Sequence, residues 1–259
     1  MIRIEGFGKE YDGAVVLEHV SLEVARGESL VVVGSSGCGK STLLRHVAGI
    51  EGAETGAVQG RISVGAVEDI TRLSETAHAS RRVRGLSIGY LFQDGALFDF
   101  CTVEENLAWP LSVHTPLEPE AIREKAREAL ELVEMASVPG ILEKRPGELS
   151  GGQRKRIALA RALVLSPDCM LYDEPTAGLD PPIATGISRL IRRLKRTRGL
   201  TSITCTHDMA CARVIADRIA YLAGARIVFT GTFQEALEDP ALQEFIQPGA
   251  THAEKQLQP

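Results

Sequence analysis

The sequence predicts an α/β protein with a mostly parallel β-sheet, and two observations support that prediction. Residues 30–33 form a continuous apolar run, which is typical of a strand that is buried on both faces. Later in the chain, predicted strands at residues 170–172 and 201–205 alternate with predicted helices, and such alternation gives a parallel sheet covered by helices. Ligands of these sheets lie beyond the carboxyl ends of the strands, so the residues that follow each strand are the first candidates for a site.

The first part of the chain predicts a sheet of a different kind. We expect short strands that turn at residues 11–13, because Leu22 and Val24 alternate with polar neighbours as in a half-buried antiparallel strand. Residues 61–64 give a further short strand signal. The polar residues 73–84 are interpreted as partly helical.

Residues 34–42 read Gly-Ser-Ser-Gly-Cys-Gly-Lys-Ser-Thr and join the strand at residues 30–33 to a helix predicted at residues 42–48. The spacing G-x-x-x-x-G-K-S is that of a phosphate-binding loop, in which the lysine reaches the β- and γ-phosphates and the serine hydroxyl coordinates Mg²⁺. A chance glycine-rich turn is the alternative, which the flanking strand and helix disfavour. The predicted nucleotide-binding residues of this phosphate loop are Gly34, Ser35, Ser36, Gly37, Cys38, Gly39, Lys40, Ser41 and Thr42.

A lobe of helices is predicted at residues 94–165, directly after a strand at residues 86–92. Thr102 and Glu105 have the spacing of a capping box, which satisfies free backbone groups at a helix start. The helix that they open is expected to end near Pro110, because proline removes a helical hydrogen bond.

Further helices follow from the spacing of apolar residues. Residues 118–135 carry apolar side chains along one face, and Ser150 is positioned to cap a third helix. Residues 187–194 place apolar side chains at i, i+3, i+4 and i+7, and a last helix is expected at residues 208–216. Residues 218–230 predict a β-hairpin around a glycine.

Polar residues that can carry chemistry follow the predicted strands. Asp173 directly follows an apolar strand, where its carboxylate is suited to hold Mg²⁺ from the side opposite Ser41. Glu174 is suited to orient or deprotonate the water that attacks the γ-phosphate. Gln93 and His207 also follow strands, so one crevice can collect all of these residues. For Asp173 and Glu174 the alternative is an acidic turn without a functional role, and for His207 it is a structural histidine.

A second phosphate-ready helix start occurs at residues 149–153, Leu-Ser-Gly-Gly-Gln, which we call the signature segment. Its glycines allow close backbone approach, and the positive end of the helix favours phosphate. An ordinary capped helix start is the alternative. Because the phosphate loop already supplies one such terminus, the second one requires its own explanation.

Composition narrows the function classes. The net charge of −5 shows no basic excess, so nucleic acid is not an expected partner. No apolar run approaches the roughly 20 residues of a membrane span, and residues 1–6 lack a signal-peptide pattern, so we expect no export. The five cysteines form no C-x-x-C pair and are expected to be reduced thiols.

Three features are interpreted without a functional role. The basic residues within 189–198 alternate with apolar ones and predict the solvated face of a helix. Residues 154–156, Arg-Lys-Arg, receive the same interpretation, with contact to a nucleotide or partner as the alternative. Trp109 is expected in the core rather than at a ligand.

Five motifs occur in a fixed order: the phosphate loop, Gln93, the signature segment, residues 172–180 (Tyr-Asp-Glu-Pro-Thr-Ala-Gly-Leu-Asp) and His207. This combination closely resembles the ATP-binding cassette ATPases that drive ABC transporters, and the resemblance covers residues 1–247. It implies a phosphate-loop NTPase fold of that type, with a mostly parallel core sheet, an antiparallel β subdomain and an inserted helical subdomain. It also implies an ATPase that uses ATP and Mg²⁺.

The expected domain organisation is a single cassette at residues 1–247. Its core lobe comprises residues 1–93 and 166–247, and its helical lobe, with the signature segment, comprises residues 94–165. Residues 248–259 are expected to form a polar tail.

The resemblance assigns roles to residues outside the phosphate loop. Tyr11 would stack on adenine and Val16 would pack beside the base and ribose, with a turn aromatic and a core valine as the alternatives. Gln93 would help to coordinate Mg²⁺ and sense the γ-phosphate. His207 would bond to the γ-phosphate and position Glu174 and water. The implied catalytic residues are Glu174, His207 and Gln93, and the implied metal ligands are Ser41, Gln93 and Asp173.

The family's arrangement also explains the second helix start. Two cassettes pack head to tail, so that Ser150 and Gly152 of one would touch the γ-phosphate bound by the other. Asp180 would link the two sites across this homodimer. The nucleotide-binding residues implied by this arrangement are Ser150, Gly151, Gly152, Gln153 and Asp180.

A finer resemblance concerns the cargo. Residues 91–98, 102–111, 172–181 and 239–245 are similar to the ATPase subunit of Mla-type, MCE-associated phospholipid transporters. This predicts a peripheral subunit at the cytoplasmic face of the membrane, with permease subunits and an MCE-domain lipid-binding protein as partners. Importers of amino acids or other small solutes share much of the pattern and are the alternative. An ATPase of DNA repair or translation is disfavoured by the acidic charge and by the lack of long insertions.

Overall fold

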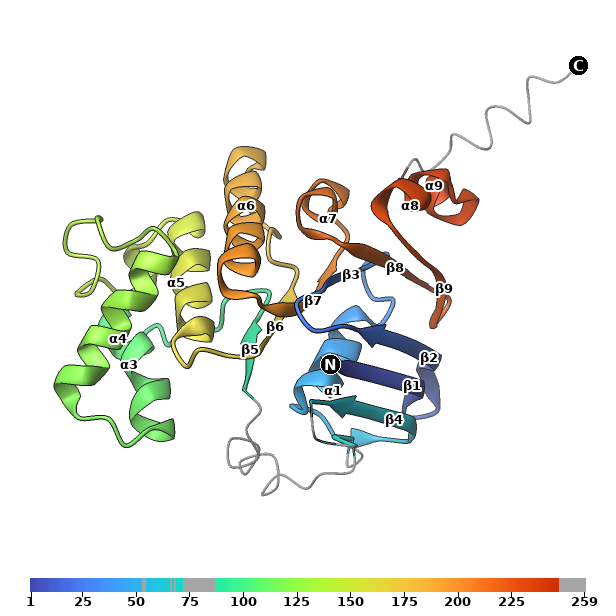
Figure 1. Cartoon of the computed structure of the whole chain (residues 1–259), viewed down its shortest axis with the longest axis horizontal. Coiled ribbons are helices and arrows are strands. Elements are labelled where there is room, and N and C mark those ends of the chain that lie inside the picture. The colour runs from blue at the N-terminus through green and yellow to red at the C-terminus, as the bar shows by residue number, and fades with distance from the viewer. Residues whose placement is uncertain (53–54, 66, 68, 72–86, 247–259) are drawn as a thin grey trace, which may run out of the picture.

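A computed structural model describes residues 1–52, 55–65, 67, 69–71 and 87–246 of the chain. Two β-sheets and the helices around them make up the described part (Figure 1). The helical segment predicted at residues 73–84 and the tail predicted at residues 248–259 lie outside the described residues. No helix within the described part of the chain is long and apolar enough to cross a membrane.

The larger sheet has six strands in the order β5-β6-β7-β3-β8-β9. All neighbouring strands pair in parallel except β8 and β9, which form the predicted hairpin, so the predicted parallel sheet is confirmed. The strands are β3 (Ser29–Val33), β5 (Ile88–Leu91), β6 (Cys169–Asp173), β7 (Thr201–Thr206), β8 (Arg218–Ala223) and β9 (Arg226–Gly231).

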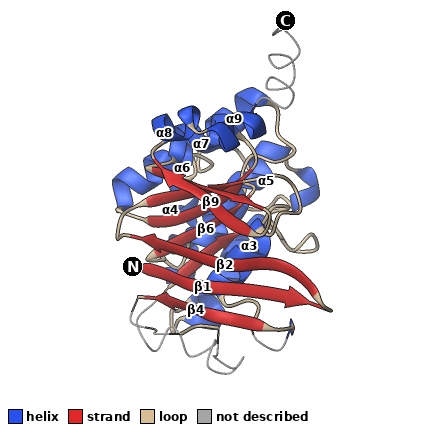
Figure 2. Ribbon diagram, turned by 90° about the vertical axis from the view of Figure 1, so that its right-hand side faces the viewer, coloured by secondary structure: helices blue, strands red, loops and turns tan. Residues whose placement is uncertain are grey.

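Both faces of this sheet are covered, as the continuous apolar run of β3 predicts. Successive side chains of a strand point to opposite faces. Val31 and Val33 accordingly join the core beneath the later helices, whereas Leu30 and Val32 join the core shared with helix α1 (Lys40–Ala48) and the smaller sheet. Figure 2 shows the smaller sheet at one end of the molecule and helices α7, α8 and α9 at the other.

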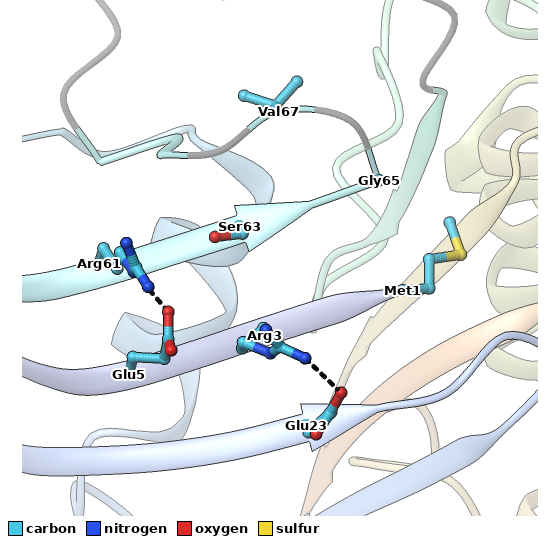
Figure 3. Close-up of a pocket in the computed structure, with 8 residues that line it drawn as sticks. All are labelled: Met1, Arg3, Glu5, Glu23, Arg61, Ser63, Gly65 and Val67. Atoms are coloured by element: carbon cyan, nitrogen blue, oxygen red, sulfur yellow. Dashed lines mark hydrogen bonds and ion pairs between the residues drawn. The ribbon is translucent and has the colours of Figure 1, made fainter.

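The smaller sheet is antiparallel and has the order β2-β1-β4. Its strands are β1 (Ile2–Tyr11), β2 (Ala14–Val24) and β4 (Val58–Val64), so the first two are longer than the short strands expected. Its outer face carries cross-strand ion pairs, which help to fix the register of the strands. Arg3 contacts Glu23 at 3.0 Å and Arg61 contacts Glu5, within a shallow pocket on this face (Figure 3).

Helices fill the segment between β5 and β6. They are α3 (Val103–His114), α4 (Pro119–Leu132), the 3₁₀ turn η3 (Pro146–Glu148) and α5 (Gly151–Leu163). Thr102 opens α3 through the predicted capping box with Glu105. Ser150 caps α5 in the same way, with Gln153 as its partner.

The prediction that α3 ends near Pro110 is wrong, because the helix continues to His114. Proline at this position removes the hydrogen bond to the carbonyl four residues earlier. Leu107 and Leu111 are buried on either side of it, and Thr115 donates from its backbone N–H (2.9 Å) and hydroxyl (2.7 Å) to the Leu111 carbonyl. The burial of the two leucines and the two hydrogen bonds from Thr115 compensate for the hydrogen bond that Pro110 cannot donate.

The prediction that Trp109 lies in the core is also wrong, because its exposed fraction is 53%. The buried side chains of α3 are Val103, Asn106, Leu107 and Leu111. Trp109 is two residues from both Leu107 and Leu111, which at 3.6 residues per turn places it on the opposite face of the helix. There its ring meets that of Phe98 edge-on, with 5.4 Å between the ring centroids.

The remaining helices follow the strands of the larger sheet. They are α6 (Pro181–Arg198), α7 (Met209–Ile215), α8 (Phe233–Glu238) and α9 (Pro240–Ile246). Helix α6 buries the predicted apolar stripe, which consists of Ile187, Leu190, Ile191 and Leu194.

Candidate functional site

The residues that follow four neighbouring strands meet at one edge of the larger sheet. Strands β5, β6, β7 and β3 run in parallel, so their carboxyl ends share this edge. The phosphate loop follows β3, Asp173 ends β6, His207 directly follows β7, and Gln93 lies two residues beyond β5. The predicted crevice residues are thus brought to the same edge by the register of the sheet.

The phosphate loop curls in a way that requires glycine at three positions. Gly37 and Gly39 have φ angles of 80° and 106°, in the region that side chains rarely adopt. A Cβ atom on Gly34 would lie 2.5 Å from the carbonyl oxygen of Leu222, and one on Gly39 would lie 3.0 Å from that of Val16. The structure therefore places Val16 against the loop, and its role beside the base and ribose remains a prediction.

The start of α1 is open to an anion. Its N-cap is Gly39, which has no side chain to bond the first turn, and that turn contains no acidic residue. The free N–H groups and the positive end of the helix dipole therefore remain available for a phosphate group. A Cβ atom on Gly37 would meet no atom within 4 Å, so this side of the loop is not packed against other described residues.

Lys40 bends back over the loop. Its exposed fraction is 5%, and its ammonium donates to the carbonyl oxygens of Gly34 and Ser35, both at 2.9 Å. The same ammonium lies 3.5 Å from Oε1 of Glu174. A buried cation held at the concave side of the loop suits a polyphosphate, because charged hydrogen bonds to phosphate are strong.

Ser41 and Asp173 form the part of the site that suits a divalent cation. The Ser41 hydroxyl donates to Oδ1 of Asp173 at 2.8 Å, and the Tyr90 hydroxyl donates to Oδ2 at 3.2 Å. Hydroxyl and carboxylate oxygens are ligands that Mg²⁺ prefers, completed by phosphate oxygens and water. The described residues contain no group of three or more His, Cys, Asp or Glu that could hold a metal ion.

Tyr90 was not singled out from the sequence. Burial and the neighbouring Asp173 raise the pKa of its hydroxyl, so it remains a hydrogen-bond donor to that carboxylate at neutral pH. Its position became clear only from the register of β5 on β6, where Tyr90 pairs with Leu171. The sequence feature that could have indicated this residue is a tyrosine in the strand that ends before Gln93.

Glu174 is held from several sides. Its backbone has a φ of 45°, a strained value for a residue other than glycine, and such strain concentrates at functional sites. Its Oε2 accepts from the Thr206 hydroxyl at 3.1 Å and from the His207 backbone N–H at 3.3 Å, and lies 3.0 Å from Nδ1 of His207. Glu174 is 7% exposed, whereas the His207 side chain is 59% exposed. The arrangement suits a carboxylate that orients a water molecule.

The remaining predicted site residues come from other elements of the chain. Ser150 is exposed at the start of α5, and a Cβ atom on Gly152 would lie 2.7 Å from Ile183. Asp180 is exposed at the start of α6. The Tyr11 hydroxyl donates to Glu51 at 2.7 Å. The predicted roles of Ser150, Asp180 and Tyr11 toward a nucleotide remain predictions.

A family model described as ABC transporter matches residues 17–177, more than half of the chain. The chain belongs to the ABC transporter family. The resemblance inferred from the five motifs is thereby confirmed at the level of the family, as is the fold class. The ATPase activity and the ligands ATP and Mg²⁺ are part of the function proposed below.

Curated members of the ABC transporter family resemble most of the chain. The sulfate/thiosulfate import ATP-binding protein CysA of Bacillus cereus is 39% identical over 243 residues, which cover 93% of this chain and 64% of that protein. The Fe(3+) ions import ATP-binding protein FbpC 2 of Rhodococcus jostii is 39% identical over 242 residues, with 92% and 64% covered. The chain therefore spans less than two thirds of the length of these relatives.

Solved structures of the same family have the same fold. A dimeric structure of the ATP-binding cassette MJ0796, bound to ADP and Pi after hydrolysis, matches with a TM-score of 0.79 and 28% identity over 90% of this chain and 99% of that one. The cassette cbiO1 of Clostridium perfringens, part of the transporter complex cbiONQ, matches with a TM-score of 0.78 and 28% identity over 98% of both chains.

The finer resemblance of this ABC transporter chain to Mla-type lipid ATPases is not supported by these relatives. Their names are those of proteins that import sulfate, thiosulfate and Fe³⁺. The comparisons favour the alternative, a small-solute importer, over the predicted lipid cargo, and they give no support to an MCE-domain partner.

Proposed function

We propose that this chain is the ATP-hydrolysing subunit of a transporter that imports a small solute through separate membrane subunits. The contact between Ser41 and Asp173 is the observation that carries the ATPase part, because it joins the phosphate loop to the carboxylate expected at a nucleotide-bound Mg²⁺. The names of the sulfate/thiosulfate and Fe³⁺ relatives support the small-solute part.

Different residues of the chain bind the phosphates, hold Mg²⁺ and orient the attacking water. Lys40 and the N–H groups of the phosphate loop bind the phosphates, and Ser41, Asp173 and Gln93 would hold Mg²⁺. A bound Mg²⁺ supplies positive charge that stabilises the charge developing on the transferred phosphoryl group. Glu174 orients the attacking water or takes its proton, and His207 holds the Glu174 carboxylate at 3.0 Å.

A second copy of the chain would complete the site. The signature segment offers an exposed serine hydroxyl and the N-terminal end of α5, both suited to a γ-phosphate. Ser150 is exposed, which leaves its hydroxyl accessible to a nucleotide bound by another copy. We infer a head-to-tail homodimer with two shared nucleotides, in which Asp180 links the two sites.

An exposed apolar patch supports contact with a membrane subunit. It consists of Phe100, Trp109 and Val113, which are 77%, 53% and 55% exposed, together with the half-buried Phe98. The Phe98 ring lies 5.9 Å from that of Phe100 and 5.4 Å from that of Trp109. Contiguous exposed apolar side chains mark interaction sites, and contact through this patch would place the chain at the cytoplasmic face of a membrane.

Partner identification tests the cargo part of the proposal. The chain is tagged, purified from detergent-solubilised membranes of its own host, and the copurified proteins are identified by mass spectrometry. We expect permease subunits and a solute-binding protein. An MCE-domain protein in their place would overturn solute import in favour of lipid transport. Nucleic acid without membrane proteins would overturn the transporter assignment.

A further inference from the structure

Lys155 is a buried cation of α5 that none of the roles above uses. Its exposed fraction is 6%, although it stands between two arginines in the sequence. Its ammonium donates to the carbonyl oxygen of Gln93 at 2.6 Å and to that of Glu174 at 3.4 Å. One side chain of the helical lobe thus bonds to the backbone of two residues of the candidate nucleotide site.

These two carbonyls belong to adjacent strand ends. Gln93 follows β5 and Glu174 follows β6, and the two strands pair in parallel. The Glu174 backbone has the strained φ of 45°, and its N–H donates to the Cys205 carbonyl at 2.9 Å. A strained conformation persists only where the surroundings hold it, and Lys155 holds the carbonyl end of this residue.

The charge of Lys155 is costly to bury. No carboxylate forms an ion pair with it among the described residues, although Asp94, Asp173 and Glu174 are near enough to favour its charged form. Burial lowers the pKa of Lys155 against this effect. An apolar side chain of similar volume would avoid the cost of removing an ammonium from water, so simple packing does not explain a lysine here.

The position of Lys155 along α5 connects two parts of the proposed mechanism. Ser150 caps this helix, and Lys155 lies five residues later, about 7.5 Å along the axis at 1.5 Å per residue. The end of α5 that would meet a second copy's nucleotide and the contact to Gln93 and Glu174 therefore belong to one rigid helix.

We propose that Lys155 is a positioning residue for ATP hydrolysis, which holds the backbones of Gln93 and Glu174 at a fixed distance from helix α5. The inference rests on the proposed ATPase function. Lys155 acts through Glu174 and Gln93 and not on the nucleotide of its own chain, which the phosphate loop binds. Its loss therefore slows turnover without weakening nucleotide binding.

The test compares Lys155→Met and Lys155→Arg with the wild-type chain. We expect Lys155→Met to lower kcat about thirtyfold while KM and the Kd for ATP change by less than about twofold. Lys155→Arg should recover kcat to within about fivefold of the wild type, because a guanidinium can donate to both carbonyls. Lys125→Met is the matched control, because the Lys125 ammonium of the same lobe pairs on the surface with Glu128 at 2.7 Å.

Two results would overturn the inference. One is a folded Lys155→Met chain with kcat within about twofold of the wild type. The other is a Lys155→Arg chain that is as slow as Lys155→Met at an equal thermal midpoint, which would indicate a packing role. If Lys155→Met does not fold, Lys155→Gln is measured against the same thresholds. Absence of hydrolysis by the wild-type chain would instead overturn the proposed function together with the inference that rests on it.

Discussion

The hydroxyl of Ser41 donates a 2.8 Å hydrogen bond to the carboxylate of Asp173, across 132 residues of sequence. The bond joins the first turn of α1 to the end of β6, two strands away from β3 in the larger sheet. It brings a hydroxyl and a carboxylate together at the edge where the phosphate loop opens. The proposed Mg²⁺ position follows from this contact.

Asp173→Asn tests that position. The amide oxygen can still accept from Ser41, so the fold should be kept, but the negative charge that favours Mg²⁺ is lost. We expect the Mg²⁺ concentration for half-maximal ATP hydrolysis to rise by at least about tenfold. The measurement is the rate of phosphate release against Mg²⁺ concentration. An unchanged half-maximal concentration would remove Asp173 from the metal site.

Lys40→Ala tests the phosphate loop. The change removes the buried ammonium that bonds to the Gly34 and Ser35 carbonyls, so the charge that meets the phosphates is lost. We expect the Kd for ATP, measured by isothermal titration calorimetry, to rise by at least about tenfold. Lys125→Ala, on the surface of α4, is the control and should leave the Kd unchanged. Equal ATP affinity of Lys40→Ala and the wild type would contradict the nucleotide assignment of this loop.

Trp109→Gln tests the exposed apolar patch. Trp109 packs edge-on against Phe98 and is 53% exposed, so the change should not disturb the core. We expect ATP hydrolysis by the isolated chain to stay within about twofold of the wild type, while copurification with membrane subunits falls severalfold because apolar contact area is lost. The measurement is quantitative mass spectrometry of the affinity-purified complex. Full recovery of the membrane subunits would show that they bind elsewhere.

The buried His46 leads us to expect that the free energy of unfolding depends on pH. The ring is fully buried, its Nδ1 bonds to the Thr42 carbonyl at 2.8 Å, and its Nε2 has no partner among the described residues. Burial lowers the pKa of His46 from the ordinary 6.5, so below that pH the unfolded chain binds the proton first. Stability is therefore lost as the pH falls below about 6.5, by up to about 1.4 kcal/mol per pH unit.

His46→Gln should remove that component. We expect the free energy of unfolding, measured by urea denaturation between pH 7 and pH 5, to fall less steeply in the variant than in the wild type. Parallel curves for the two proteins would show that His46 does not titrate in this range.

The part of the site that the sequence predicts rests on local spacing. Gly37 and Gly39 of the phosphate loop are required by their positive φ angles, which are a local property of the loop. The meeting of Gln93, Asp173 and His207 follows from parallel strands, whose carboxyl ends share an edge. Neither the glycine positions nor the shared strand edge depends on how side chains of distant elements pack.

Features that depend on packing between elements were not predictable in this way. Pro110 continues a helix because Leu107 and Leu111 are buried against the rest of the lobe. Lys155 stands in a run of three basic residues, which indicates a solvated surface, yet it points inward. The available signal was its spacing of three from the buried Gly152 and four from the buried Leu159, which places it on the buried face of α5.

We propose that two copies of this chain share each nucleotide, and the variant Glu174→Gln provides a direct test. The amide cannot take a proton from water, so bound ATP should persist between the copies. The measurement is the molar mass of the variant by light scattering, with and without ATP and Mg²⁺. We expect a monomer without nucleotide and a dimer with ATP. A mass that stays monomeric at saturating ATP would contradict it.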